Sequence, residues 1–186
     1  MDRRILKTKR AIKEAYLALL KKKSNYKDIV VKELVDLADV NRSTFYLHYY
    51  DADQVFEELI DEMFEDVSSK IPENGFEIEK ADEIISQMNA LIRDNEKYAL
   101  IVSKASDHPY FSSSLLKTMK NKIDLSSFRN PHMSKEEKEF LMEMIAYMTY
   151  SMTAYLIRNI DETQIEERFV LLRKYIYEPV IEKIIR

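Results

Sequence analysis

The chain has 186 residues, of which 46% are hydrophobic and 33% are charged, so it can bury a sizeable core and long-range disorder is excluded. One glycine and four prolines leave few sites for tight turns, and abundant leucine, isoleucine, glutamate, lysine and methionine favour an all-α fold. The absence of cysteine excludes disulfides and thiolate metal sites. No apolar run follows the charged first residues, so we expect no secretory signal and a cytoplasmic protein.

The net charge of −4 is divided unevenly along the chain. Residues 1–50 hold 12 Lys and Arg against 6 Asp and Glu, whereas residues 51–186 hold 17 against 27. A basic segment followed by an acidic body predicts that one end of the protein meets a polyanion. The alternative is a merely uneven surface, but the basic segment coincides with a two-helix motif.

That motif spans residues 29–50 and reads as two short helices separated by a tight break. The first helix repeats apolar residues at three- and four-residue steps, which predicts one buried face made of Val31, Leu34, Val35 and Ala38. The break follows at residues 39–41. We expect the side chain of Asn41 to cap the second helix, which runs from Arg42 to about Tyr49.

The second helix has an unusual distribution of polar and aromatic residues. Phe45 and Tyr49 are four residues apart and are predicted to face inward. The remaining side chains are then left facing outward: Arg42, Ser43, Thr44, Tyr46 and His48. A short helix that presents arginine, hydroxyl groups and tyrosine is suited to reading base edges in the major groove of double-stranded DNA.

The rest of the chain is also predicted to be helical, with one clear break at residues 71–75, which hold the only glycine. The expected helices are 4–22, 52–69, 79–93, 95–106, 110–124, 135–159 and 164–184. Their starts carry capping residues: Asp51, Asn95, Pro109, and the capping boxes Ser134 with Glu137 and Thr163 with Glu166.

Residues 144–157 contain no charge, which predicts a helix buried on more than one side. The segment is shorter than the ~20 residues of a membrane span and rich in hydroxyl groups, so we expect no membrane association. This helix and the last predicted helix, 164–184, would form a dimer interface when each of two chains contributes both of them. The residues predicted to lie in it are Tyr150, Ala154, Tyr155, Phe169, Leu172 and Ile176. The alternative is that one chain buries both helices against its own core.

The first ~65 residues resemble the TetR family of bacterial transcriptional repressors. The resemblance rests on Ile12, Ala15 and Leu19 in the first helix, on Ile29, Val31 and Leu34, on Asp53 and Val55, and above all on the run NRSTFYLHYY at residues 41–50. It implies an all-α homodimer with a three-helix, helix-turn-helix DNA-binding head at residues 1–50. Residues 51–186 would form a larger helical body for dimerisation and ligand binding.

The predicted DNA-binding residues are Lys32, Arg42, Ser43, Thr44, Tyr46, His48 and Tyr49. Arg42 suits a guanine edge or a phosphate, Thr44 a thymine methyl group or a phosphate, and Lys32 a phosphate. The resemblance implies phosphate contacts for His48 and Tyr49, although Tyr49 can equally be part of the core. Each of the exposed polar residues could instead be a solvated surface group, and Lys7, Lys9 and Arg10 could either reach DNA or remain solvated.

Three positions depart from the family pattern. The residue that usually caps the second helix is Val30, the usual turn glycine is Asp39, and a common phosphate-binding lysine is Ala52. Asp39 tolerates a left-handed backbone better than most residues. These losses predict weaker phosphate contacts without loss of the reading helix.

The body is rich in methionine and tyrosine, which suit an adaptable, mainly apolar cavity. The residues predicted to line it are Met88, Ile92, Tyr98, Val102, Phe111, Leu115, Met119, Phe140, Met144 and Tyr147. A bound effector would then be apolar or weakly polar, and its binding would release the repressor from a two-fold operator. The alternative is that these stripes are ordinary core. The segment 108–111 could be a lid or a plain helix start.

The sequence argues against a metal site, a cofactor and an enzyme. Its three histidines are scattered, no glycine-rich loop can hold a phosphate, and no nucleophile motif is present. A competing hypothesis keeps DNA binding but has no small-molecule effector and works through a protein partner. A helical enzyme with an incidental basic head is the least favoured interpretation.

Overall fold

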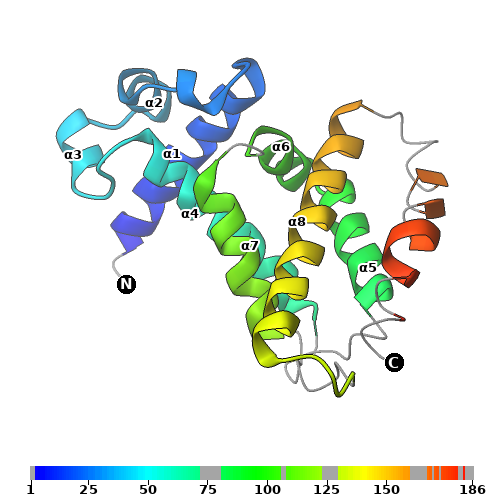
Figure 1. The fold of residues 1–186 in the computed structure, drawn as a ribbon. Helices are drawn as coiled ribbons and strands as arrows, with labels where there is room; N and C mark the ends of the chain where they lie inside the picture. Colours follow the sequence, from blue (N-terminus) through cyan, green and yellow to red (C-terminus); the bar gives the residue numbers. More distant parts are fainter. Residues whose placement is uncertain are drawn as a thin grey trace. The chain divides into compact units, whose positions relative to one another are not determined.

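The structure is a computed structural model that describes residues 3–71, 81–105, 108–122 and 130–159, together with 167–168, 170–171, 173–179 and 182 (Figure 1). Every regular element in these residues is a helix, which confirms the predicted all-α fold. The chain divides into two compact units, residues 1–63 and 64–186. The division expected from the sequence, after residue 50, lies before this boundary at residue 63. The difference arises because the first turns of the fourth helix pack into the core of the first unit.

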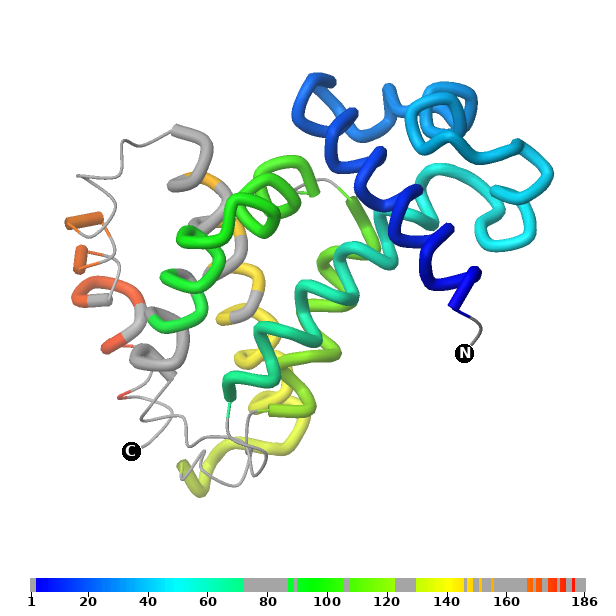
Figure 2. Tube along the Cα trace, turned by 180° about the vertical axis from the view of Figure 1, so that it is seen from behind, coloured from blue at the N-terminus to red at the C-terminus, as the bar shows by residue number. Residues whose placement is uncertain are grey.

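The first unit begins with α1 (Arg3–Lys22), a single 3-10 turn η1 (Tyr26–Asp28), and two short helices, α2 (Val31–Ala38) and α3 (Arg42–Tyr46). Helix α4 (Ala52–Ser69) starts in this unit and continues into the second. Helix α2 packs against both α1 and α3, and Figure 2 follows the chain through these turns.

The core of the first unit is built around stacked aromatic rings. Phe56 on α4 is fully buried and stacks on Tyr16 of α1, with 5.4 Å between the ring centroids. Tyr26 in η1 packs on the same phenylalanine ring, with 5.4 Å between the ring centroids, and thereby anchors this loop. Rings in such arrangements contribute about 0.5–1.5 kcal/mol beyond their burial. This cluster therefore fixes α1, η1 and the start of α4 together.

An ion cluster joins the same two helices at their surface. Lys9 of α1 lies 2.7 Å from a carboxylate oxygen of Glu58 on α4, and Lys13 pairs with both Glu58 and Glu62. Burial raises the pKa of Glu58, but the ion pairs with Lys9 and Lys13 and the nearby Tyr49 hydroxyl outweigh burial and hold that pKa below its ordinary value. The folded protein therefore favours the ionised form of this carboxylate.

The second unit contains the end of α4 and the helices α5 (Ala81–Asp94), α6 (Glu96–Lys104), α7 (Pro109–Lys122) and α8 (Lys135–Asn159). Helix α8 packs against α5, α6 and α7, and α5 packs against α6 (Figure 1). The core of this unit includes a contact between the rings of Phe64 and Phe111, whose centroids are 5.1 Å apart.

Most of the predicted helix starts are confirmed. The carboxylate of Asp51 accepts from the backbone N–H of Gln54, and the side chain of Asn95 accepts from that of Tyr98. Pro109 opens α7, and Ser134 and Glu137 form the predicted capping box, in which each side chain accepts from the other residue's backbone N–H. The second predicted capping box, Thr163 with Glu166, lies outside the described residues.

Two predictions about local structure need correction or restriction. Asn41 occupies the N-cap position of α3, but its side chain makes no capping hydrogen bond, so the expected cap is wrong. The last predicted helix, 164–184, is described only in part, and its Arg173–Tyr177 segment is a π-helix. Among the described residues, no helix is long and apolar enough to cross a membrane.

Replacing Glu58 with glutamine should lower the thermal stability of the protein near neutral pH. Because the folded-state pKa of Glu58 is lowered, its ionised form contributes stability that is present above the ordinary value of 4.5 and is lost as pH falls through the lowered pKa. Thermal unfolding followed by circular dichroism between about pH 7 and pH 3 should show a shallower decline for Glu58→Gln than for the unmodified chain.

Glu57 supplies the matched control for this measurement. Burial, followed by repulsion from Asp51, Asp53 and Asp61, raises the pKa of Glu57, so its charge opposes folding at neutral pH. Glu57→Gln should therefore leave the stability near neutral pH unchanged or increase it. Equal losses in the two variants would contradict a specific role for the ion cluster.

Candidate nucleic-acid interface

The turn between α2 and α3 sets the direction of the third helix. Asp39 ends α2 in the left-handed conformation, with φ 52° and ψ 49°, and its backbone N–H donates to the carbonyl of Val35. The N–H of Val40 donates to the same carbonyl at 3.1 Å. Asp39 therefore performs the backbone role usually given to glycine, as expected from its tolerance of this conformation. The N-cap of α2, Val30, makes no side-chain capping bond.

Two aromatic residues orient α3 against the rest of the first unit. Phe45 is fully buried and packs on Tyr49 with 5.6 Å between their ring centroids. Tyr49 is 2% exposed, and the Lys9 amine lies 5.1 Å from the centre of its ring. Burial, with the nearby Glu58 carboxylate, raises the pKa of the Tyr49 phenol, which therefore stays protonated. Tyr49 was predicted to bind phosphate, but its ring belongs to the core.

Most of the other predicted DNA-binding residues lie on the exposed side of α3 and in the turn after it. Arg42, Ser43 and Tyr46 are exposed, and Thr44 and His48 are half-buried. Lys32 is exposed on α2. Ala52, which stands where the family pattern has a phosphate-binding lysine, is buried. The structure thus brings five predicted polar side chains together on α3 and the turn after it.

Arg42 and Tyr46 form a pair on this exposed face. One guanidinium nitrogen of Arg42 donates to the Tyr46 hydroxyl at 3.3 Å, and the guanidinium carbon lies 5.6 Å from the centre of the tyrosine ring. The two side chains are one helical turn apart, so each limits the rotamers of the other. The arginine is consequently held in place while its remaining N–H donors stay available.

The cations of α1 are placed differently from those of α3. Lys9 is bound in the ion cluster with Glu58, and Arg10 pairs with Glu14 on its own helix at 2.8 Å. Lys7 is exposed. Of the three α1 cations considered as DNA contacts, Lys9 is therefore occupied within the protein, and the Arg10 pair is exposed and easily exchanged for another anion.

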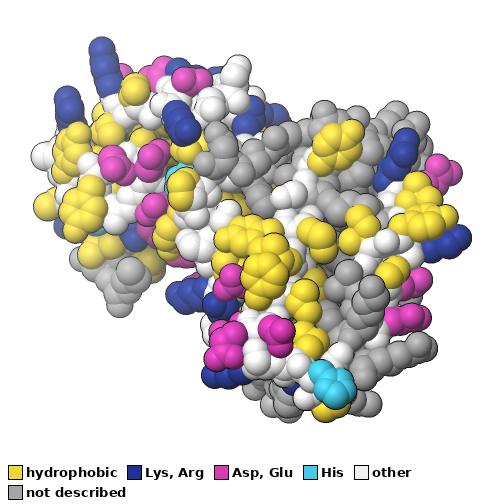
Figure 3. All heavy atoms as spheres, viewed as in Figure 1, with side chains coloured by type: hydrophobic (Ala, Val, Ile, Leu, Met, Phe, Trp, Pro, Cys, Tyr) yellow, Lys and Arg dark blue, Asp and Glu magenta, His cyan; other side chains and the backbone are white. Residues whose placement is uncertain are grey.

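The structure adds two exposed apolar side chains that sequence reasoning omitted. Leu47 is 80% exposed, and Tyr50 is 83% exposed. The backbone N–H of Tyr50 donates to the side chain of Gln54 at 2.8 Å, which fixes the chain at the start of α4. Both lie around α3, where Figure 3 shows hydrophobic side chains at the surface. The helical position of Leu47, two residues after a buried phenylalanine, could have signalled its exposure.

The residues predicted to line a ligand pocket differ in their burial. Ile92, Tyr98, Val102, Phe111 and Leu115 are buried in the core of the second unit. The Tyr98 hydroxyl donates to Asp66 at 2.8 Å, so it is satisfied by the protein. Met119 and Tyr147 are half-buried. Phe140 and Met144 are exposed on α8, because this face of the helix turns away from α5, α6 and α7.

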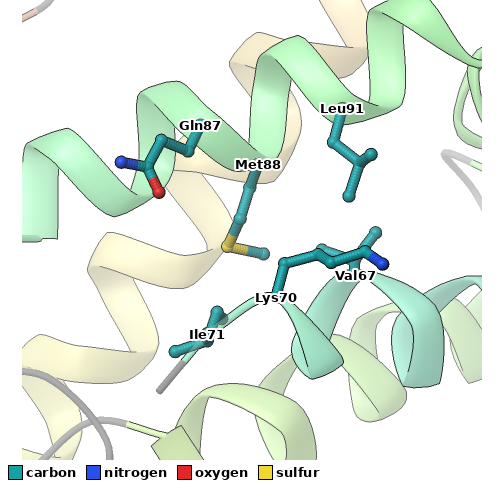
Figure 4. A pocket seen from close by; sticks show the side chains of 6 residues that line it. All are labelled: Val67, Lys70, Ile71, Gln87, Met88 and Leu91. Carbon is teal, nitrogen blue, oxygen red and sulfur yellow. The ribbon is translucent and has the colours of Figure 1, made fainter.

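A cavity of about 220 Å³ lies between the end of α4 and α5 (Figure 4). Among the residues predicted for the pocket, Met88 lines it. The other lining residues are Val67, Lys70, Ile71, Gln87 and Leu91. Met88 and Leu91 point from α5 toward Val67 and Lys70. The cavity is thus mainly apolar, with one amine and one amide at its walls.

The segment 108–111 is a plain helix start. The backbone N–H of Tyr110 donates to Nδ1 of His108 at 3.2 Å, so the buried His108 caps α7. Within the described residues, no group of three or more histidine, aspartate or glutamate side chains is placed to hold a metal ion.

Of the residues predicted for a dimer interface, Tyr155 is 59% exposed and Ile176 is half-buried. The side chains of Tyr150 and Ala154, as well as Phe169 and Leu172, lie outside the described residues. Tyr155 continues the exposed apolar stripe of α8, which also contains Phe140, Met144 and the half-buried Tyr147.

Comparison with known proteins gives a partial sequence match. No protein-family model matches the chain. YxbF of Bacillus subtilis (strain 168), an uncharacterized helix-turn-helix-type transcriptional regulator, is 24% identical over 90 residues. The match covers 46% of this chain but only 24% of YxbF, so the chain spans about a quarter of that protein.

Solved structures match over most of the chain. A TetR transcriptional regulator from Streptococcus agalactiae 2603V superposes with a TM-score of 0.64 and 22% identity, covering 92% of this chain and 96% of that one. A protein assigned to the TetR family from Syntrophomonas wolfei str. Goettingen has a TM-score of 0.65 and 14% identity, covering 92% and 95%. All three proteins are described as transcriptional regulators. This chain has the fold of TetR-family transcriptional regulators.

Proposed function

We propose that this chain is a dimeric, sequence-specific DNA-binding transcriptional regulator of the TetR family. We further propose that it represses transcription and is released by a small apolar or weakly polar effector. The observation that carries DNA binding is the exposed face of α3, which is the second helix of the helix-turn-helix and combines arginine, serine and tyrosine. The fold shared with TetR-type regulators supports the same function.

In this proposal, α3 enters the major groove of a two-fold operator. Arg42 donates to a guanine edge, and Tyr46 both orients it and contacts a base or phosphate. Lys32 and His48 bind phosphates on either side, and Ser43 and Thr44 contact the backbone or nearby bases. Tyr49 does not touch DNA but holds α3 through its contact with Phe45. Few phosphate contacts remain, so the salt dependence of binding should be modest.

Arg42→Ala and Tyr46→Ala should each weaken operator binding by about 1–3 kcal/mol, as loss of a base-edge contact usually does. Because the two side chains hold each other, the double variant should lose less than the sum of the single losses. Gel shifts on an operator selected from random sequences would measure these affinities. Lys135→Ala, an exposed residue at the start of α8, serves as the control and should bind normally.

Lys32→Ala distinguishes a phosphate contact from base reading. It should weaken binding to all sequences alike and reduce the salt slope by about one. If both the Arg42 and the Tyr46 variants bind the operator with unchanged affinity, α3 is not the helix that reads the bases.

Dimerisation is proposed to use the exposed apolar stripe of α8. Phe140 and Tyr155 are 58% and 59% exposed, with Met144 between them on the same side of the helix. Met142 and Ile145, on the other side, are buried in the chain's own core. Figure 3 shows hydrophobic side chains along α7 and α8 on this face of the second unit. An apolar stripe of this length suits burial against a second copy, with a two-fold axis that matches a two-fold operator.

Phe140→Glu should convert the dimer to a monomer, because it places a charge in an apolar contact. The measurement is the sedimentation of the purified protein across a range of concentrations. His132→Glu, an exposed change outside the stripe, should leave the oligomeric state unchanged. A monomeric unmodified protein, or a Phe140→Glu protein that dimerises normally, would argue against this interface.

The cavity between α4 and α5 is the proposed effector site. At about 220 Å³ it is smaller than the ~300–1,000 Å³ of most ligand sites, so it suits a small compound. Helix α4 runs from the first unit into the second, and its last turn borders the cavity. A ligand placed there contacts the helix that continues the DNA-binding unit, which gives a route by which binding could change DNA affinity.

A small apolar effector should raise the melting temperature of the protein and lower its operator affinity. Met88→Phe, which fills part of the cavity, should weaken both responses, whereas Met119→Phe, a similar change on α7, should preserve them. A thermal-shift screen followed by gel shifts provides the test. If no compound changes stability or DNA binding, the competing hypothesis of a regulator that works through a protein partner is favoured.

A further inference from the structure

Leu47, the residue directly after α3, is apolar and 80% exposed. The backbone of Leu47 keeps helical dihedral angles of φ −73° and ψ −17°, and its N–H donates to the carbonyls of Phe45 and Thr44. The N–H of His48 donates to the carbonyl of Phe45 at 2.9 Å. The main chain of Leu47 is therefore ordered, and its Cα–Cβ bond has a defined direction on the helix.

That direction is the centre of the outward face. At about 100° per residue, Leu47 and Ser43 lie opposite the buried pair Phe45 and Tyr49. Arg42 and Tyr46 lie on one side of Leu47, and Thr44 and His48 lie on the other. A bulky aliphatic group thus occupies the middle of a face whose other members are polar or carry a polar tip.

We infer that Leu47 reads thymine in the operator through a contact with its C5-methyl group. The inference rests on the proposed DNA-binding function and names one base for it. Leucine has no donor or acceptor, so it cannot read a base by hydrogen bonding. The C5-methyl of thymine is the apolar feature that base pairs present in the major groove. Arg42 on the adjacent flank is suited to guanine, so the two residues together predict a half-site in which thymine lies close to guanine.

The charge of this part of the chain favours DNA over an apolar protein partner at Leu47. Residues 1–50 carry twice as many Lys and Arg as Asp and Glu, 12 against 6. The neighbours of Leu47 on α3 include an arginine that keeps unpaired donors, which an apolar protein surface would leave unsatisfied. A polyanion with methyl groups in its groove satisfies both the cation and the leucine.

The experiment replaces thymine by deoxyuridine, which removes only the C5-methyl group. The operator is first selected from random DNA with the full-length protein, and each thymine is then replaced symmetrically in both half-sites. At one position the unmodified protein should lose about threefold to fivefold in affinity per half-site, the effect of one buried methyl-sized group. Leu47→Ala should lose a similar factor on thymine DNA and should no longer distinguish thymine from deoxyuridine.

Tyr50→Ala is the matched control, since Tyr50 is equally exposed but lies beyond α3. It should retain the preference for thymine. Selected DNA whose affinity is insensitive to every thymine replacement, or a Leu47→Ala protein that still prefers thymine, would overturn the inference while leaving DNA binding intact. If operator affinity does not depend on the thymine methyl group and Leu47→Ala instead loses binding to another protein, Leu47 belongs to a protein interface. Failure to select any DNA would remove the proposed function itself and the inference with it.

Discussion

The burial of Phe45 and Tyr49 is the constraint on which the candidate interface depends. With both rings inside the first unit, the remaining positions of α3 have no inward direction left, and Arg42, Ser43, Tyr46 and Leu47 must face outward. The helix has only five residues, too few to be stable by its own hydrogen bonds. Its direction is therefore set by side-chain packing and by the left-handed Asp39 that precedes it.

The same packing explains how charge is distributed in the first unit. Tyr49 lies beneath the Lys9 amine, and Lys9 and Lys13 are paired with carboxylates of α4. Residues 51–63 add six acidic groups and no basic ones, which cancels the excess of residues 1–50. The compact unit is thus close to neutral overall, and two of its lysines are held in ion pairs with α4. Under the proposed function, specificity would then depend on base contacts more than on general attraction to phosphate.

Sequence periodicity was sufficient for helices α1 to α8 and most of their starts, because caps and apolar spacing act locally. It failed where a side chain had more than one available partner. Asn41 stands at the N-cap position without making the expected hydrogen bond, and the Tyr98 hydroxyl, considered for a ligand, donates to Asp66. Leu47 was passed over because hydrophobic residues are assumed to be inside, although its angular position opposite Phe45 places it outside.

Helix α8 shows why an apolar sequence could not by itself separate core, cavity and interface. In a helix with a charged face, the sequence indicates which side is exposed to water. Residues 144–157 carry no charge on any side, so the sequence gives no such indication. Both Met144 and Ile145 are therefore compatible with burial, and only the packing of α5, α6 and α7 distinguishes them. That packing covers Met142 and Ile145 and leaves Phe140, Met144 and Tyr155 uncovered. When an apolar helix is covered on one side only, its other side is stabilised by burial against a second surface. This is the physical basis for the proposed dimer.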